Sequence, residues 1–411
     1  MKVYRRVLEN GLRVLAAPRK NLESVAIVVG VNFGSIDEGE RLNGLAHFIE
    51  HMLFKGTKKR SWEQINEITR SYGILYNAET DYETTMYEAV AYRRYLDKAM
   101  DLISDMVRNP VFDSRELKME RGPILHEIAM RREDPDSILY DNMPRALFNE
   151  DGKLMPPDSR AITSGIGRED LVKAYNRYYN PRNMALTIYG GVGIEEAFGL
   201  AKRYMSGFHR KHFAPEKHAF TRRKSAEKLY IRKRDIERGE IGIGFPCNGI
   251  AGNSSTAITE YVAMDAIAEL LSNRIYDKVR EEHGLSYDPS VDYEPYGSFG
   301  YISASAGATT AKLREIKSIM LSELARLKKT GAKREELEEV KRGLGIKYAM
   351  GLDHALDSAI EISEMELMYG DGRMMGCIQG ELEKLDTRTI SHFVKEYITP
   401  SRYGEIILRK A

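Results

Sequence analysis

Two histidines and a glutamate stand close together in the run His47-Phe48-Ile49-Glu50-His51. If this run is helical, His47 and His51 lie on one face, where both imidazoles can bind the same metal ion. Glu50 faces the same space and can act as a general base. The order is the reverse of the His-Glu-x-x-His run of many zinc hydrolases. The spacing predicts a zinc hydrolase site; the alternative is two surface histidines beside a solvated charge.

A catalytic zinc ion normally has three protein ligands and keeps one position for water, so a further carboxylate or histidine is required. The best segment runs from Leu117 to Ile128 and contains Glu120 and Glu127. Because they are seven residues apart, two helical turns, both carboxylates point to one side. We expect Glu127 to be the third ligand and Glu120 to orient a ligand or water. Pro123 is expected to loosen this helix locally.

Local signals place the first run on a helix that follows three strands. Asn10-Gly11 predicts a tight hairpin between strands at 3–8 and 12–17. Asn43 and Gly44 are expected to open the helix, which ends near Gly56. The other strands expected in this half lie at 24–34, 74–80, 84–92 and 183–189, and the other helices at 62–72, 95–108, 114–133, 137–148, 168–178 and from about 194.

The second half of the chain repeats this plan faintly. Its expected strands lie at 228–233, 239–245, 285–293 and 297–305, and its expected helices at 255–271, 274–282 and from 310 to about 363. A Tyr-x-x-Pro pattern recurs at Pro181 and Pro400, which are 219 residues apart, although such a recurrence also arises by coincidence. The same shift carries the first run onto Ala266, Glu269 and Leu270, so the second copy has no histidine ligands.

Mixed rather than alternating strands and helices predict an α+β fold, with two homologous domains, each a mainly antiparallel sheet covered by helices. We expect an N-terminal zinc-binding domain at 1–208, a linker at 209–227 and a C-terminal homologous domain at 228–411 that lacks zinc ligands.

The composition excludes several classes of protein. The 411 residues carry 62 basic and 61 acidic side chains, so no basic excess indicates nucleic-acid binding. No apolar run reaches the roughly 18 residues of a membrane span. Only Cys247 and Cys377 occur, which excludes a disulfide framework and a cysteine-rich metal site. The N-terminus shows no secretory signal, so we expect a cytoplasmic protein.

The segment from Gly44 to Thr57, Gly-Leu-Ala-His-Phe-Ile-Glu-His-Met-Leu-Phe-Lys-Gly-Thr, resembles the signature of the M16 metallopeptidases, the group of pitrilysin, insulin-degrading enzyme and mitochondrial processing peptidase. The resemblance implies an M16/LuxS-like fold and one Zn²⁺ per chain, with Glu127 as third ligand and Glu120 as an additional catalytic-site glutamate. A His₂Glu ligand set also accepts manganese or cobalt.

Two further segments resemble substrate-binding parts of the family. Asn77 and Ala78 match an edge strand that holds an extended peptide by backbone pairing, which is β-augmentation; the alternative is an ordinary hairpin edge. Arg280 and Tyr287 match an Arg/Tyr pair in the family's domain without metal. The resemblance implies that this domain, at 228–411, helps to hold substrate, with the tyrosine hydroxyl near the scissile carbonyl. Asp288-Pro289 departs from the family, which continues there as a strand.

The resemblance is to the M16B branch and covers nearly the whole chain. Because zinc residues and the Arg/Tyr pair occur together, it implies a homodimer with two equivalent sites around a chamber. The alternatives for each site are completion within one chain and completion across the two chains. We expect a zinc metalloendopeptidase acting on unfolded peptides or short polypeptides. The alternatives are a dedicated precursor- or leader-processing peptidase and a non-hydrolytic peptide-binding scaffold subunit.

Overall fold

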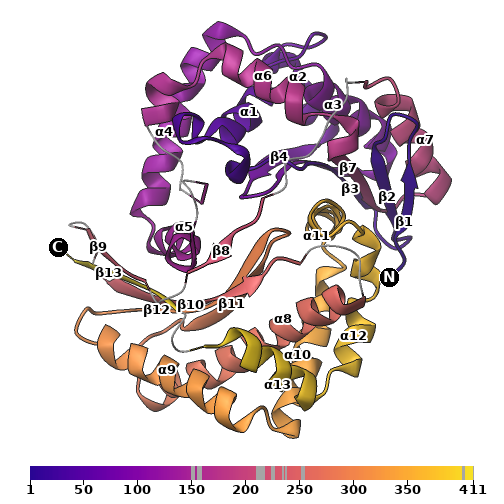
Figure 1. Ribbon diagram of the computed structural model, residues 1–411. Coiled ribbons are helices and arrows are strands. Elements are labelled where there is room, and N and C mark those ends of the chain that lie inside the picture. The colour runs from indigo at the N-terminus through magenta and orange to yellow at the C-terminus, as the bar shows by residue number, and fades with distance from the viewer. Residues whose placement is uncertain are drawn as a thin grey trace. The chain divides into compact units, whose positions relative to one another are not determined.

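The computed structural model describes residues 1–149, 153–154, 160–209, 218–223, 227–233, 236, 238–250, 255–399 and 403–410. The chain packs as two compact units, and neither is continuous in sequence. Unit 1 comprises Met1–Ile128, Pro157–Lys217 and Ala349–Cys377; unit 2 comprises Ala129–Pro156, His218–Tyr348 and Ile378–Ala411. Each unit contains a sheet covered by helices, which confirms the α+β fold class (Figure 1).

The sheet of unit 1 has six strands in the order β1-β2-β7-β3-β5-β4, and only the β2–β7 pair is parallel. Its hairpin forms as predicted: Gly11 has φ +90°, and its N–H donates to the Leu8 carbonyl oxygen. The strands are β1 (Tyr4–Val7), β2 (Arg13–Pro18), β3 (Ser24–Val31), β4 (Leu75–Thr80), β5 (Thr85–Tyr92) and β7 (Met184–Gly190).

The helices of unit 1 lie at nearly the positions that the sequence predicts. They are α1 (Leu45–Leu53), α2 (Trp62–Tyr72), α3 (Leu96–Arg108), α4 (Ser114–Glu133, whose last residues belong to unit 2), α6 (Arg168–Tyr178), α7 (Ile194–Met205) and α11 (Ala355–Met368). Short 3₁₀ or π turns occupy Ser35–Asp37, Glu40–Leu42, Arg93–Tyr95, Ala161–Gly165, Pro181–Asn183 and Gly372–Gly376. Helix α4 continues through Pro123, and the local loosening expected there stays a prediction.

The two faces of this sheet are covered by helices from different parts of the sequence. Val29 and Tyr87 belong to the core cluster under α1 and α3. Gly30 points to the opposite face, where a Cβ atom would lie 2.6 Å from Leu367 Cδ1 of α11. A glycine at this position therefore allows α11 to pack closely on the sheet.

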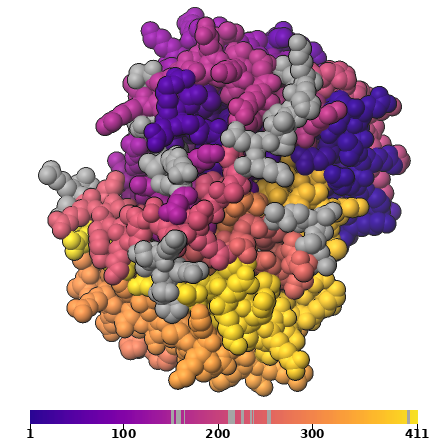
Figure 2. Space-filling view, in the orientation of Figure 1, coloured from indigo at the N-terminus to yellow at the C-terminus, as the bar shows by residue number. Residues whose placement is uncertain are grey.

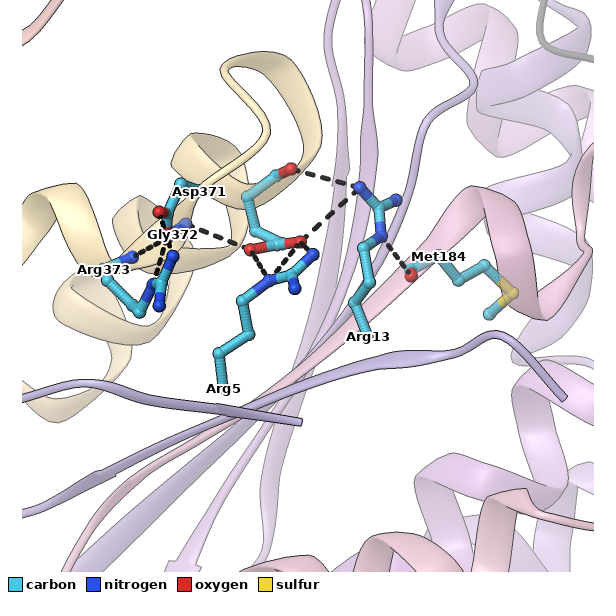
Figure 3. A network of polar contacts seen from close by, with 7 residues as sticks. Arg5, Arg13, Met184, Asp371, Gly372 and Arg373 are labelled. Carbon is cyan, nitrogen blue, oxygen red and sulfur yellow. Dashed lines mark hydrogen bonds and ion pairs between the residues drawn. The ribbon is translucent and has the colours of Figure 1, made fainter. Parts of the chain in front are cut away.

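A buried carboxylate attaches the end of α11 to the N-terminal strands. The side chain of Glu366 is fully buried and accepts hydrogen bonds from Arg5 Nε and Nη2 at 2.9–3.1 Å and from Gly372 N at 3.1 Å. Arg13 lies 3.7 Å from the same carboxylate and donates to the Glu366 carbonyl oxygen (Figure 3). In the space-filling view the N-terminal strands, in indigo, lie beside golden atoms of the segment that contains the end of α11 (Figure 2).

The main sheet of unit 2 has the order β11-β12-β10-β13-β9, and only the β13–β9 pair is parallel. Its strands are β9 (Lys228–Lys233), β10 (Gly239–Asn248), β11 (Ser290–Pro295), β12 (Phe299–Ala308) and β13 (Gly404–Lys410), and a small separate pair is β6 (Phe148–Asn149) with β8 (Thr221–Arg222).

The helices of unit 2 are α5 (Pro135–Leu147), α8 (Ser255–Tyr276), the π-helical η6 (Asp277–Glu282), α9 (Leu313–Thr330), α10 (Arg334–Gly351, which ends in unit 1), α12 (Ile378–Lys384) and α13 (Thr387–Tyr397). Helix α5 packs on β10 and β13. A Cβ at Gly244 would lie 2.4 Å from Met143 Sδ, so glycine allows close packing here too.

Two sequence predictions in this half are wrong in detail. The helices expected at 255–271 and 274–282 form one run, because neither glycine nor proline interrupts it, and the run becomes π-helical at Asp277. The strand expected from residue 285 begins only at Ser290, because Pro289 has no N–H group to pair.

Some predictions remain open. The recurrence at Pro400 and most of the linker, at 210–217 and 224–226, lie outside the described residues. The predicted boundaries at 208 and 228 separate two homologous repeats, whereas the units above are defined by packing. These boundaries therefore stay a prediction. Among the described residues, no helix is long and apolar enough to cross a membrane.

Candidate metal centre

Helix α1 is held at its start by a carboxylate from the preceding loop. Gly44, the N-cap, is left-handed with φ +93° and offers no side chain, so the first N–H groups need another acceptor. Glu38 takes this role: its two oxygens accept from Gly44 N and Ala46 N, each at 2.6 Å. Burial raises the pKa of Glu38 to about 8, although these backbone bonds oppose the rise. No capping signature marks Glu38, because it stands six residues before the cap.

Three ligand groups converge at α1, namely two of its own imidazoles and one carboxylate. His47 Nε2 and His51 Nε2 are 3.1 Å apart; Glu127 Oε1 lies 3.4 Å from His47 Nε2, and Glu127 Oε2 lies 3.3 Å from His51 Nε2. Metal–ligand bonds of about 2.0–2.1 Å in a tetrahedral zinc site separate the ligand atoms by about 3.3 Å. The donor set and its spacing therefore fit zinc. Within the described part of the chain, no other cluster of at least three His, Cys, Asp or Glu has such spacing.

The charges of these groups depend on one another. Burial by itself lowers the pKa of His51, but its hydrogen bonds to Glu120 and Glu127 outweigh this effect and raise the pKa to about 9. Hydrogen bonds from His47 and His51 hold the pKa of Glu127 well below its usual range. Without metal, the carboxylate of Glu127 is thus ionised and a proton resides on His51 at neutral pH.

Glu120 stands behind the ligands, as its spacing from Glu127 predicts. Its Oε1 lies 2.9 Å from His51 Nδ1, and its Oε2 lies 2.5 Å from Lys55 Nζ. Burial opposes ionisation of Glu120, yet these two partners lower its pKa. A carboxylate on Nδ1 fixes the ring so that Nε2 faces the metal position. The sequence prediction assigned no role to Lys55, which lies two residues beyond the end of α1, where helix spacing is no guide.

Glu50 stands between the two histidines in the sequence of α1 and is buried, with an exposed fraction of 8%. Thr80 Oγ1 donates to Glu50 Oε2 at 2.5 Å. Burial raises the pKa of Glu50, while the adjacent His47 and the Thr80 hydroxyl oppose the rise. A carboxylate with a raised pKa next to a metal position suits proton transfer near neutral pH. The sequence prediction included Thr80 only as part of an edge-strand segment.

Asn77 and Ala78 lie on β4, which is at the edge of the sheet of unit 1. They pair with Glu88 and Tyr87 of β5, so the other side of β4 presents backbone groups that no described strand pairs. This is the geometry that an added peptide strand requires. The roles of Asn77 and Ala78 in binding stay predictions.

Arg280 and Tyr287 contact each other in unit 2. Arg280 Nη1 donates to the Tyr287 carbonyl oxygen at 2.9 Å, and the guanidinium lies 4.0 Å from the centre of the Tyr287 ring. The same guanidinium lies 5.0 Å from the centre of the Tyr276 ring. Tyr287 is 74% exposed, so its hydroxyl is available to a ligand. The two residues therefore form one structural pair, although their part in a reaction stays a prediction.

Comparison with known proteins decides the family. The sequence model described as "Insulinase (Peptidase family M16)" matches residues 13–156, and "Peptidase M16 inactive domain" matches residues 165–344. The chain belongs to peptidase family M16. The run from His47 to His51 lies in the first match, and Arg280 and Tyr287 lie in the second. The family resemblance noted in the sequence is confirmed.

Relatives and solved structures agree with the M16 assignment. An "uncharacterized zinc protease", YmxG of Bacillus subtilis, is 26% identical over 97% of this chain and 96% of its own length. Another, ML0855 of Mycobacterium leprae, is 28% identical over 99% of this chain and 91% of its own. The crystal structure of a protease from Helicobacter pylori has a TM-score of 0.89 at 20% identity, over 99% of both chains, and shows the shared fold.

Proposed function

We propose that this M16 protein is a zinc-dependent metalloendopeptidase of M16B type that hydrolyses unfolded peptides or short polypeptides inside the chamber of a homodimer. The observation that carries the proposal is the convergence of His47, His51 and Glu127 beside the buried carboxylate of Glu50. The names of its relatives support zinc as the metal.

The side chains of the site divide the work of peptide hydrolysis. When bound, zinc lowers the pKa of a water molecule and polarises the scissile carbonyl. Glu50 takes the proton of the attacking water and passes it to the leaving amine. Glu120, itself paired with Lys55, keeps His51 oriented during these steps.

Substrate binding is assigned to two separate places. The open edge of β4, at Asn77 and Ala78, pairs with an extended peptide and so selects chains that are unfolded rather than one particular sequence. Arg280 holds Tyr287, whose hydroxyl stabilises the charge that develops on the carbonyl oxygen.

The decisive variant is Glu50→Gln. An amide keeps the size of the side chain but cannot accept the proton, so zinc content should stay at one ion per chain while cleavage of a peptide mixture falls by at least about 100-fold. Glu67→Gln, an exposed glutamate on α2, is the control and should behave like the wild type. Unchanged cleavage by Glu50→Gln would contradict the mechanism. If the zinc-loaded wild type cut no peptide, the result would support a non-hydrolytic scaffold subunit.

A further inference from the structure

The hydroxyl group of Thr80 joins the general base to the edge strand. Thr80 is the last residue of β4, and Tyr76 and Ala78 precede it on the same face of the strand. That face packs toward α1: the Tyr76 ring lies 5.3 Å from the ring of Phe54, the C-cap of α1. The register of β4 therefore directs Thr80 toward the helix that carries Glu50.

The direction of the hydrogen bond follows from the neighbours of Thr80. Thr85, opposite on β5, donates its own hydroxyl proton to the Phe33 carbonyl oxygen at 2.8 Å. The Thr80 and Thr85 oxygens are 3.4 Å apart, whereas Thr80 Oγ1 and Glu50 Oε2 are 2.5 Å apart. The single proton of Thr80 is thus donated to Glu50.

This bond fixes one oxygen of the Glu50 carboxylate, and no described residue forms a hydrogen bond with the other oxygen. A carboxylate rotates about its last side-chain torsion unless a partner holds it, since this torsion has broad minima. With Oε2 held by Thr80, the plane of the carboxylate is set before a substrate arrives. Preorganised orientation of this kind determines how often a reactive geometry is reached.

We propose that Thr80 is a positioning residue that fixes the Glu50 carboxylate, so that the strand assigned to peptide binding also sets the general base. The proposal rests on the proposed function and adds to it a coupling between substrate strand and proton transfer. In the part of the chain that the structure describes, the Thr80 hydroxyl forms hydrogen-bonding contacts with Glu50 and Thr85 and with no ligand of the metal centre, so its loss should separate turnover from metal binding.

The test compares Thr80→Val with Thr80→Ser. Valine has nearly the shape of threonine and suits a strand, so the fold should remain. We expect one zinc per chain, a KM within about threefold of wild type and a kcat about 100-fold lower, since misorientation of one catalytic group costs about this much. Serine restores the hydroxyl and should return kcat to within about threefold of wild type.

Thr69→Val is the matched control, because Thr69 is also buried but donates to Asn66 O within α2. It should leave kcat and KM unchanged. Wild-type kcat in Thr80→Val would overturn the proposal, and so would a kcat in Thr80→Ser as low as that in Thr80→Val.

Crystal structures of the zinc-loaded proteins give a readout that does not need activity. Thr80→Val should show the Glu50 carboxylate rotated or in several orientations, and Thr80→Ser should show the wild-type orientation. An unchanged, single orientation in Thr80→Val would overturn the inference even if the wild type proved inactive. Inactivity of the wild type alone would instead contradict the proposed function.

Discussion

At the scale of single residues, three groups of the candidate centre are each held by another group. Glu120 holds His51, Lys55 holds Glu120, and Thr80 holds Glu50. The donors therefore face one another at 3.1–3.4 Å even before a metal is considered. Without metal, that arrangement stabilises a proton on His51, so protons and zinc compete for the same atoms.

Zinc affinity should therefore keep rising with pH until an unusually high pH is reached. The partners of His51 raise its pKa to about 9, and zinc must displace this proton. Below about pH 9 the apparent affinity should fall about tenfold per pH unit, and above it the affinity should level off. Glu127 adds nothing to this slope near neutral pH, because its pKa lies well below its usual range. Calorimetry at pH 7 in two buffers of different ionisation enthalpy should find about one proton released per zinc.

A control for this prediction is Glu120→Gln. It removes a partner that raises the pKa of His51, so the levelling of zinc affinity should move to lower pH. An affinity that does not change between pH 7 and pH 8.5 in the wild type would contradict the assignment of the proton to His51.

The sequence predicts the residues of the centre that follow from local spacing. His47, Glu50 and His51 are recognisable because a helix repeats every 3.6 residues, and Glu120 and Glu127 because two turns separate them. Three supporting groups were not assigned: Glu38, Lys55 and Thr80. Their roles depend on where loop, helix end and strand meet in the folded chain, which side-chain periodicity does not encode.

At the scale of elements, strands and helices with clear signals were predicted almost to the residue. The hairpin at Asn10-Gly11 and α2, α4 and α6 are examples, because turn residues and helix periodicity mark them. The packing of α11 on the sheet of unit 1 was not predicted. It depends on Gly30, which gives space, and on Glu366, which attaches the helix to strands more than 350 residues earlier. Such long-range contacts leave no periodic signal.

Glu366→Gln tests how strongly this attachment stabilises unit 1. The substitution removes a fully buried charge and leaves Arg5 and Arg13, both mostly buried, without their anion. Loss of one partner of a buried ion pair should lower the free energy of unfolding by about 3 kcal/mol. The measurement is the first transition in urea unfolding of the metal-free protein.

The control for this prediction uses the neighbouring residue on β1. Arg6 pairs with Glu195, whose side chain is 76% exposed, so Glu195→Gln should have little effect on unfolding. Equal effects of the two substitutions would mean that Glu366 does not anchor α11.

At the scale of the whole molecule, the proposed reaction uses groups from both units. Unit 1 holds the metal donors and Glu50, whereas unit 2 holds Arg280 and Tyr287. Tyr287→Phe is a clean variant, because the Arg280 contacts to the ring and to the carbonyl oxygen remain and only the hydroxyl is lost. Paired with Glu50→Gln, it can show whether a homodimer builds each site from one chain or from two.

Heterodimers of differently tagged chains decide this question. If the sites are shared across chains, a Glu50→Gln chain paired with a Tyr287→Phe chain has one intact site and should show about half the wild-type activity. A wild-type chain paired with the doubly substituted chain should then be inactive, because each site receives one substitution. If each site lies within one chain, the two results are exchanged. Because each heterodimer carries the same two substitutions, only their distribution between the chains differs. Sedimentation of the wild type as a monomer at assay concentration would contradict the homodimer itself.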